Sequence, residues 1–182
     1  AGPANKQGRI AADNICGGNS RFTGSQGSSI LKLFGLTAAS TGINEKAAQA
    51  AGIAYDKVVL FPASHAAYYP GARSMTMKVL YEKESLRLLG AQIVGGDGVD
   101  KRIDVLATAI RAKMTALELT ELDLSYAPPY SSAKDPVNMA GFMIEDLESG
   151  KVRQFHWNDV EDLPCDGSAT LLDVRTAWEY QR

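Results

Sequence analysis

The amino-acid sequence predicts an α+β fold in which helices pack on one face of an antiparallel sheet, followed by an incomplete α/β start. Apolar and polar residues alternate over the neighbouring stretches 75–82 and 86–94, which indicates a β-hairpin. Two later stretches, beginning at Val99 and Pro136, repeat apolar residues with the spacing of amphipathic helices. Strands that come first and covering helices that follow are typical of an α+β domain.

The composition is that of a globular protein and argues against several kinds of partner. The 182 residues are 45% hydrophobic and 22% charged, with a formal net charge of -2. There is no polybasic run to bind nucleic acid, and no apolar stretch long enough to span a bilayer. The cysteines Cys16 and Cys165 and the histidines His65 and His156 show no metal-ligand spacing. We therefore expect no nucleic acid, no membrane, no metal and a cytoplasmic setting.

The first expected element is a helix that begins near Pro3 and ends before Gly17. Proline suits a first helical turn, and glycine is common just past a helix end. The small residues of this helix would let it approach another element closely. The polar stretch 19–29 is rich in Gly and Ser, which predicts a loop and a first domain boundary.

Between residues 29 and 61 we expect strands around 30–34, 37–43 and 55–61, with one short helix between the last two. This helix would be capped by Asn44 and would end at Gly52. The hairpin described above then completes the sheet.

The helix that follows the glycine-rich stretch 95–98 has one apolar face, which predicts packing on the sheet. Its apolar residues are Val99, Ile103, Leu106, Ala107 and Ile110. We place Asp100, Arg102 and Lys113 on the opposite, exposed face.

The segment 125–136 separates a leucine-rich helical turn from the last long helix. Its paired prolines forbid regular structure and hold the backbone extended. Asp135 is then expected to cap a helix with Pro136 in its first position, ending near Gly150. The buried stripe of this helix is expected to be Val137, Ala140, Ile144 and Leu147.

After Gly150 the character of the sequence changes. A polar turn leads to the apolar run 170–174, which suggests the opening of a second α/β unit. About thirty residues are too few to close a core of their own. We therefore divide the chain into units 1–18, 19–150 and 151–182.

Three stretches resemble the glutathione reductase-like pyridine nucleotide-disulfide oxidoreductases. LLGAQIVGGDGVDKRIDVLATAI, residues 88–110, is similar to the hairpin and helix of their C-terminal dimerisation domain. SYAPPYSSAKDPVNMAGF, residues 125–142, resembles the branch containing coenzyme A-disulfide reductases and NADH oxidases. AGPANKQGRIAADNI, residues 1–15, is similar to the segment that closes the FAD domain in that branch.

The last part of the chain, from QFHWNDVEDLP through LLDVRTAWEY, resembles the start of a rhodanese domain. Such a fusion points to coenzyme A-disulfide, persulfide or polysulfide reductases. The family's redox-active cysteine and dinucleotide fingerprints belong to preceding domains, and no GxGxxG occurs in this sequence. The rhodanese nucleophile is expected beyond Arg182, so Cys165 is not a candidate for it.

The resemblance implies a fragment of an FAD-dependent NAD(P)H:disulfide oxidoreductase that forms a homodimer and is inactive alone. Its substrate would be coenzyme A disulfide or a related persulfide or polysulfide. An NADH oxidase or peroxidase of the same family, or a non-enzymatic interaction module, remains an alternative. Tyr126 and Tyr68 are similar to tyrosines that reach the partner's active site, and their neighbours Tyr69 and Tyr130 could exchange roles with them.

The resemblance also implies a flavin contact at the first helix. Amides around Gly2, Pro3, Ala4 and Asn5 would face the flavin and stabilise negative charge on it. Without the rest of the FAD domain we expect no tight binding of FAD by this chain.

Four further residues are expected to have no chemical role. We place His65 at the surface or at a dimer interface, and Cys16 in a buried or half-buried position. Arg73 and Lys134 are expected on solvated surface, with charge attraction to a coenzyme A phosphate as the alternative.

Overall fold

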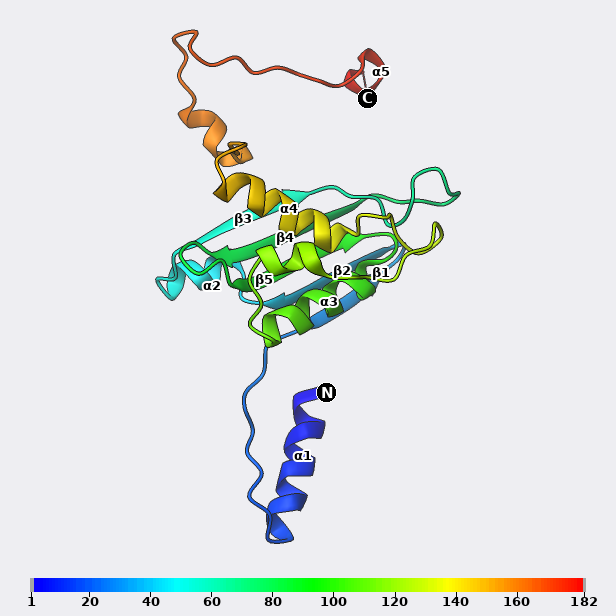
Figure 1. The fold of residues 1–182 in the computed structure, drawn as a ribbon, viewed down its shortest axis with the longest axis vertical. Helices are drawn as coiled ribbons and strands as arrows, with labels where there is room; N and C mark the ends of the chain where they lie inside the picture. The colour runs from blue at the N-terminus through cyan, green and yellow to red at the C-terminus, as the bar shows by residue number, and fades with distance from the viewer. Residues whose placement is uncertain (1, 182) are drawn as a thin grey trace.

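The centre of the molecule is a five-stranded sheet with the strand order β1-β2-β5-β4-β3 (Figure 1). The structure, a computed structural model, describes residues 2–181. The strands are β1 (Ser29–Leu33), β2 (Leu36–Gly42), β3 (Tyr55–Leu60), β4 (Met75–Glu82) and β5 (Leu88–Gly95). All neighbouring strands pair in the antiparallel sense, which confirms the predicted sheet and its hairpin.

Two long helices cover one face of this sheet, as the sequence predicts (Figure 1). Helix α3 (Val99–Arg111) packs on β2 and β5, and helix α4 (Pro136–Glu148) reaches β3. The 3-10 helix η1 (Leu117–Glu121) packs against α4. The α+β class is therefore confirmed.

The core lies between the sheet and these two helices. Met77, Val79 and Ile93 point toward the helices and are fully buried, because alternate residues of a strand face opposite sides. They meet the buried residues Leu106 of α3 and Ile144 of α4 within one hydrophobic cluster. Each such side chain contributes roughly 1.5–3 kcal/mol when it is fully buried.

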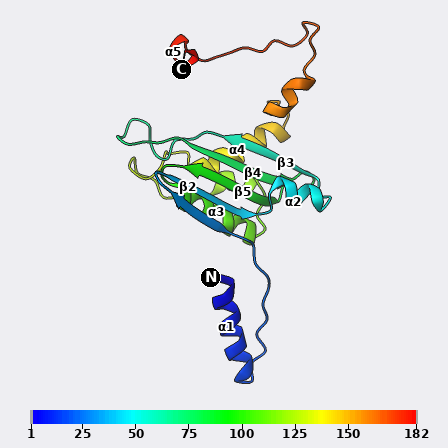
Figure 2. The ribbon, with the colours of Figure 1, turned by 180° about the vertical axis from the view of Figure 1, so that it is seen from behind.

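The short helix α2 (Glu45–Ala50) lies at one end of the sheet on the face opposite the core (Figure 2). Its Glu45 carboxylate bonds Lys57 at 2.6 Å and Lys78 at 2.7 Å. These lysines alternate along β3 and β4 with residues of the core. Burial alone would raise the pKa of Glu45, but the hydrogen bonds from both lysines outweigh it and lower the pKa to about 2.

Both predicted N-caps are confirmed. The Asn44 side chain accepts a hydrogen bond from the Ala47 amide at 2.9 Å, and Asp135 accepts one from the Val137 amide at 3.0 Å. Pro136 occupies the first turn of α4, where its missing N–H leaves no bond unmade.

The prediction that Arg102 lies on the exposed face of α3 is wrong. Its side chain is only 1% exposed and is the largest fully buried side chain in the described chain. Arg102 follows Val99 by three positions and precedes Leu106 by four, so it belongs to the buried stripe of the helix. A charge is tolerated there because Asp135, itself buried, forms an ion pair with it.

Both ends of the chain lead away from the sheet (Figure 1). Helix α1 (Gly2–Ile15) confirms the predicted first helix, but none of its described residues is buried. Residues 151–181 contain the 3-10 helix η2 (Trp157–Asp162) and the short helix α5 (Ala177–Tyr180), with no strand in that described stretch.

Candidate functional site

Two loops at one end of the sheet bring the predicted tyrosines together. Tyr68 lies in the loop 61–74 between β3 and β4, and Tyr126 lies in the loop 122–135 between η1 and α4. Their hydroxyl oxygens are 3.1 Å apart and share a hydrogen bond. Tyr68 is 76% exposed and Tyr126 47% exposed, so both phenols are available to another molecule.

Backbone hydrogen bonds hold the two loops in place. The loop of Tyr68 is closed by Ser64, whose amide donates to the Arg73 carbonyl at 2.8 Å and whose hydroxyl accepts from the Arg73 amide at 3.1 Å. The Ala66 amide then donates across to the Ser131 carbonyl of the Tyr126 loop at 3.1 Å. The hydroxyl pair is thus supported by a second bond between the same two loops.

The hydrogen bond between the phenols changes the acidity of one of them. The bond to Tyr68 raises the pKa of Tyr126 above the ordinary value of 10, and partial desolvation adds to this effect. Tyr126 therefore keeps its proton further into the alkaline range than a free tyrosine does. A protonated phenol can donate a hydrogen bond to an anion such as a thiolate.

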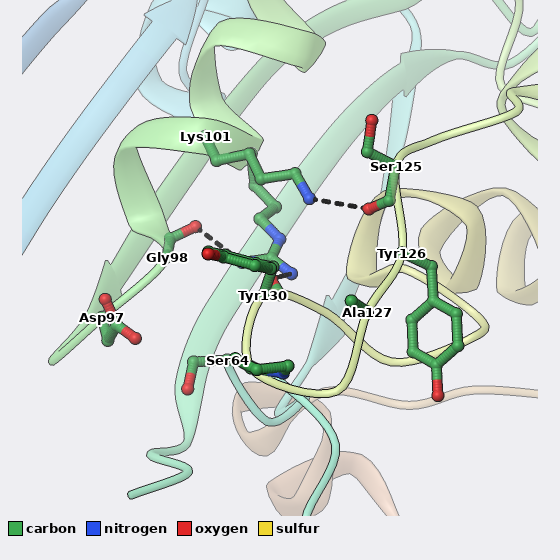
Figure 3. A pocket seen from close by; sticks show the side chains of 10 residues that line it. Ser64, Asp97, Gly98, Lys101, Ser125, Tyr126, Ala127 and Tyr130 are labelled. Atoms are coloured by element: carbon green, nitrogen blue, oxygen red, sulfur yellow. Dashed lines mark hydrogen bonds between the residues drawn. The ribbon is translucent and has the colours of Figure 1, made fainter. Parts of the chain in front are cut away.

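A pocket of about 400 Å³ lies beside this pair, between the first turn of α3 and the loop of Tyr126. Figure 3 shows Tyr126 at its edge, with the hydroxyl pointing away from Lys101 and Ser125. The Lys101 ammonium donates to the Ser125 carbonyl at 3.2 Å, which fixes the residue before Tyr126. Tyr130, also named from the sequence, lines the same pocket and is exposed.

The predicted flavin contacts do not lie with the tyrosines. Gly2, Pro3, Ala4 and Asn5 form the exposed first turn of α1. Gly2 and Pro3 line a wide, open groove of about 1000 Å³ between α1, the segment 20–28 and α3. Since α1 forms one wall of an open groove and buries nothing, these four residues do not by themselves enclose a flavin.

Two expectations about single residues are wrong. His65 is 5% exposed rather than at the surface, because its ring packs edge-on against Tyr69 and its Nδ1 lies 3.1 Å from the Ala66 carbonyl. Its alternative place at a dimer interface stays a prediction. Cys16 is exposed in the turn that follows α1.

No group of three His, Cys, Asp or Glu side chains among residues 2–181 is arranged to hold a metal ion. None of the helices in this part of the chain is both long enough and apolar enough to cross a bilayer.

The residues that hold the tyrosine loops escaped the sequence analysis. Arg102, Ser131 and Asp135 form a buried polar cluster. The sequence predicted Asp135 only as a helix cap, placed Arg102 on an exposed face and gave Ser131 no role. The available signal was the position of Arg102 on the apolar stripe of its own helix.

Comparison with known proteins identifies the domain. Residues 29–136 match the pyridine nucleotide-disulphide oxidoreductase dimerisation domain. This match covers more than half of the chain and begins at the first residue of β1. The chain belongs to this family. The family consists of oxidoreductases. The matched residues contain the whole sheet and helix α3, and α4 begins at the last matched residue.

Individual relatives agree with this family assignment. A coenzyme A disulfide reductase from Staphylococcus haemolyticus is 41% identical over 145 residues, which are 79% of this chain and 32% of that protein. Reduced Bacillus anthracis CoADR-RHD superposes with a TM-score of 0.84 at 48% identity, covering 88% of this chain and 29% of that one.

A third relative is an NAD-dependent persulfide reductase from A. fulgidus. It has a TM-score of 0.84 at 44% identity, covering 87% of this chain and 29% of that one. This chain thus spans about a third of the length of the curated relatives it matches. The predicted resemblance to the coenzyme A-disulfide reductase branch is confirmed, whereas the resemblance of residues 151–182 to a rhodanese domain stays a prediction.

Proposed function

We propose that this chain is the dimerisation part of an FAD-dependent NAD(P)H:disulfide oxidoreductase whose substrate is coenzyme A disulfide or a related persulfide or polysulfide. The observation that carries the proposal is the hydrogen-bonded Tyr68–Tyr126 pair, held on exposed loops of a reductase dimerisation domain. The relatives named coenzyme A disulfide reductase and persulfide reductase support this class of substrate.

The tyrosine pair would stabilise the thiolate that leaves when a disulfide is reduced. A phenol with a pKa near 10 would lose about 2 kcal/mol by transferring its proton to a thiolate whose acid has a pKa near 8.5. Donating a hydrogen bond involves no such loss. Because one hydroxyl donates to the other, the hydroxyl that accepts this bond becomes a stronger donor toward the anion.

The reacting sulfur would come from the partner subunit of a homodimer. The two cysteines of this sequence, Cys16 and Cys165, lie on neither tyrosine loop. Both phenols are exposed at the surface of the domain, where a second copy can meet them. In a symmetric dimer each subunit would then lend its tyrosine pair to the other.

FAD and NAD(P)H would supply the electrons in the whole enzyme. The first turn of α1 would add backbone amides, at Gly2, Pro3, Ala4 and Asn5, to a flavin site that other parts of the protein enclose. Under this proposal residues 1–18 end the FAD domain, 19–150 form the dimerisation domain, and 151–182 begin a rhodanese domain. The cytoplasm is the compartment that supplies both reduced dinucleotide and reducing conditions for thiols.

Replacing the two phenols tests the proposal in the whole reductase. We expect Tyr126→Phe and Tyr68→Phe each to lower turnover of coenzyme A disulfide by roughly 10- to 100-fold, the loss of one hydrogen bond to a charged group. Flavin content should not change. The measurement is NADH or NADPH oxidation that depends on the disulfide, followed spectrophotometrically.

Tyr180→Phe is the matched control, because Tyr180 is also an exposed tyrosine but lies in α5, away from both loops. Unchanged turnover in both loop variants would remove the proposed role of the pair. A wild-type enzyme that reduces oxygen but not coenzyme A disulfide would instead support the NADH oxidase alternative.

A further inference from the structure

Arg102 occupies the point where the helix layer meets the tyrosine loops. Its guanidinium makes hydrogen bonds through all three of its nitrogens. Nη1 donates to the Gly98 carbonyl at 3.2 Å, and Nε donates to Asp135 at 3.2 Å. Nη2 donates to the Tyr130 carbonyl at 3.3 Å, to the Ser131 hydroxyl at 3.1 Å and to Asp135 at 3.0 Å.

These bonds form a closed buried cluster. The Ser131 hydroxyl accepts from Arg102 and donates to Asp135 at 2.6 Å, so every member of the cluster is bonded to the other two. Arg102, Ser131 and Asp135 are all buried. A guanidinium out of reach of water must keep its partners, so the cluster has little freedom to rearrange.

The cluster is connected to both tyrosines. Tyr130 and Ser131 lie on the loop that carries Tyr126, only four and five residues after it. The Ser131 carbonyl accepts the Ala66 amide, which lies two residues before Tyr68. One side chain therefore anchors the loop of Tyr126 directly and the loop of Tyr68 through a single further hydrogen bond.

Glycines of the stretch 95–98 leave space for this arrangement. A Cβ atom at Gly98 would lie 2.2 Å from Nη1 of Arg102, and Gly98 also has a φ of +70°. A Cβ atom at Gly96 would lie 2.5 Å from Cδ of Arg73, the residue that closes the loop of Tyr68. Gly98 therefore leaves room for the guanidinium of Arg102, and Gly96 leaves room for the side chain of Arg73.

We propose that Arg102 is a positioning residue for the Tyr68–Tyr126 pair: it fixes the two loops relative to each other so that the phenols stay hydrogen-bonded. This role rests on the proposed function of the pair. Arg102 lines the pocket beside the tyrosines but is only 1% exposed, so we assign its role to the bonds that hold the loops.

Arg102→Lys and Ser131→Ala test the positioning in this chain. Lysine keeps the positive charge but lacks the planar fork that reaches Gly98, Tyr130 and Asp135 together. Ser131→Ala is a milder variant that leaves the ion pair in place if Arg102→Lys fails to fold. We expect the Ala66 amide to exchange its hydrogen about five- to tenfold faster in either variant, the effect of weakening one hydrogen bond.

The matched control for these exchange measurements is Glu45→Gln, which disrupts a different ion-pair cluster, on the opposite face of the sheet. It should leave the Ala66 amide unchanged. In all variants the amide of Val79 in β4 reports on the fold as a whole. Equal acceleration at Ala66 and Val79, or no acceleration at Ala66, would overturn the positioning role.

A double-mutant cycle in the whole reductase tests the link to chemistry. Arg102→Lys should lower kcat with coenzyme A disulfide by roughly five- to tenfold, with little change in KM or flavin content. In a Tyr126→Phe background the same substitution should change kcat by less than about twofold, because the phenol it positions is already absent.

The two proposals fail in different ways. If the kcat losses of Arg102→Lys and Tyr126→Phe multiply in the double variant, the effect of Arg102 is merely structural. That result would overturn the role of Arg102 and leave that of the tyrosines intact. Wild-type turnover in Tyr126→Phe and Tyr68→Phe would instead remove the function of the pair. The exchange rate at Ala66 would then still decide whether Arg102 holds the loops.

Discussion

Tyr81 shows how a single buried hydroxyl links stability to pH. Its ring is fully buried under the helices, and its hydroxyl donates to Glu148 at the end of α4 at 2.9 Å. Burial raises the pKa of Tyr81 well above the ordinary value of 10, and the hydrogen bond to Glu148 raises it further. The folded protein therefore binds this proton more tightly than the unfolded chain does.

The sign of the resulting pH effect follows from linkage. The stabilisation is fully present below pH about 10 and is lost as the pH rises above that value, where the unfolded chain releases the proton first. We expect urea unfolding to require less denaturant at pH 11 than at pH 8.

Tyr81→Phe should reduce the loss of stability between pH 8 and pH 11. It should also destabilise the domain by about 0.5–1.5 kcal/mol near pH 7, the net value of one hydrogen bond. Urea unfolding at both pH values checks this. An equal alkaline loss in the variant would assign the effect to other groups.

At the scale of elements, the two confirmed N-caps have different energetic consequences. Asn44 caps α2 through one hydrogen bond at the surface. Asp135 caps α4 and also neutralises the buried Arg102. Loss of a simple cap costs about 1 kcal/mol, whereas loss of one partner of a buried ion pair costs about 3–5 kcal/mol.

We therefore predict that Asn44→Ala lowers the free energy of unfolding by about 1 kcal/mol and Asp135→Ala by about 3–5 kcal/mol. Chemical denaturation of this chain measures both. Similar losses of unfolding free energy in the two variants would mean that other groups compensate the buried charge of Arg102 once Asp135 is absent. Asp135→Asn, which keeps a capping oxygen but removes the charge, separates the two contributions.

The molecule as a whole has one sheet face that the long helices α3 and α4 leave open, with only the short helix α2 at one end of it. Ala39 and Ile93 point into the core, so their neighbours on the strands, Ala38 and Val94, point to the other side. Four large apolar side chains, Leu31, Leu33, Leu36 and Val94, are exposed there. A contiguous apolar surface of this kind is typical of a face that other protein covers.

We expect this chain to associate with a second copy in solution, as the dimerisation-domain family implies. Size-exclusion chromatography with light scattering should give a mass of about twice the 19.5 kDa of one chain. A monomer across the accessible concentration range would show that other parts of the protein are needed for the dimer interface.

The sequence by itself determined the elements of this protein and their order. The hairpin and the caps at Asn44 and Asp135 were predicted correctly. The apolar faces of α3 and α4 were predicted as well, except that the buried Arg102 was placed on the opposite face of α3. Each depends on residues within a few positions of one another, where strand alternation, helix periodicity and capping act. The resemblance of three stretches added the family, and the family resemblance added the two tyrosines.

Only the tertiary structure decided how distant residues meet. The hydroxyls of Tyr68 and Tyr126 are 58 positions apart in sequence, and Arg102 is 33 positions from Asp135. Arg102 and His65 were misplaced for the same reason. A polar side chain is exposed by default and becomes buried only when a partner satisfies it, and that partner comes from another segment that the fold brings near.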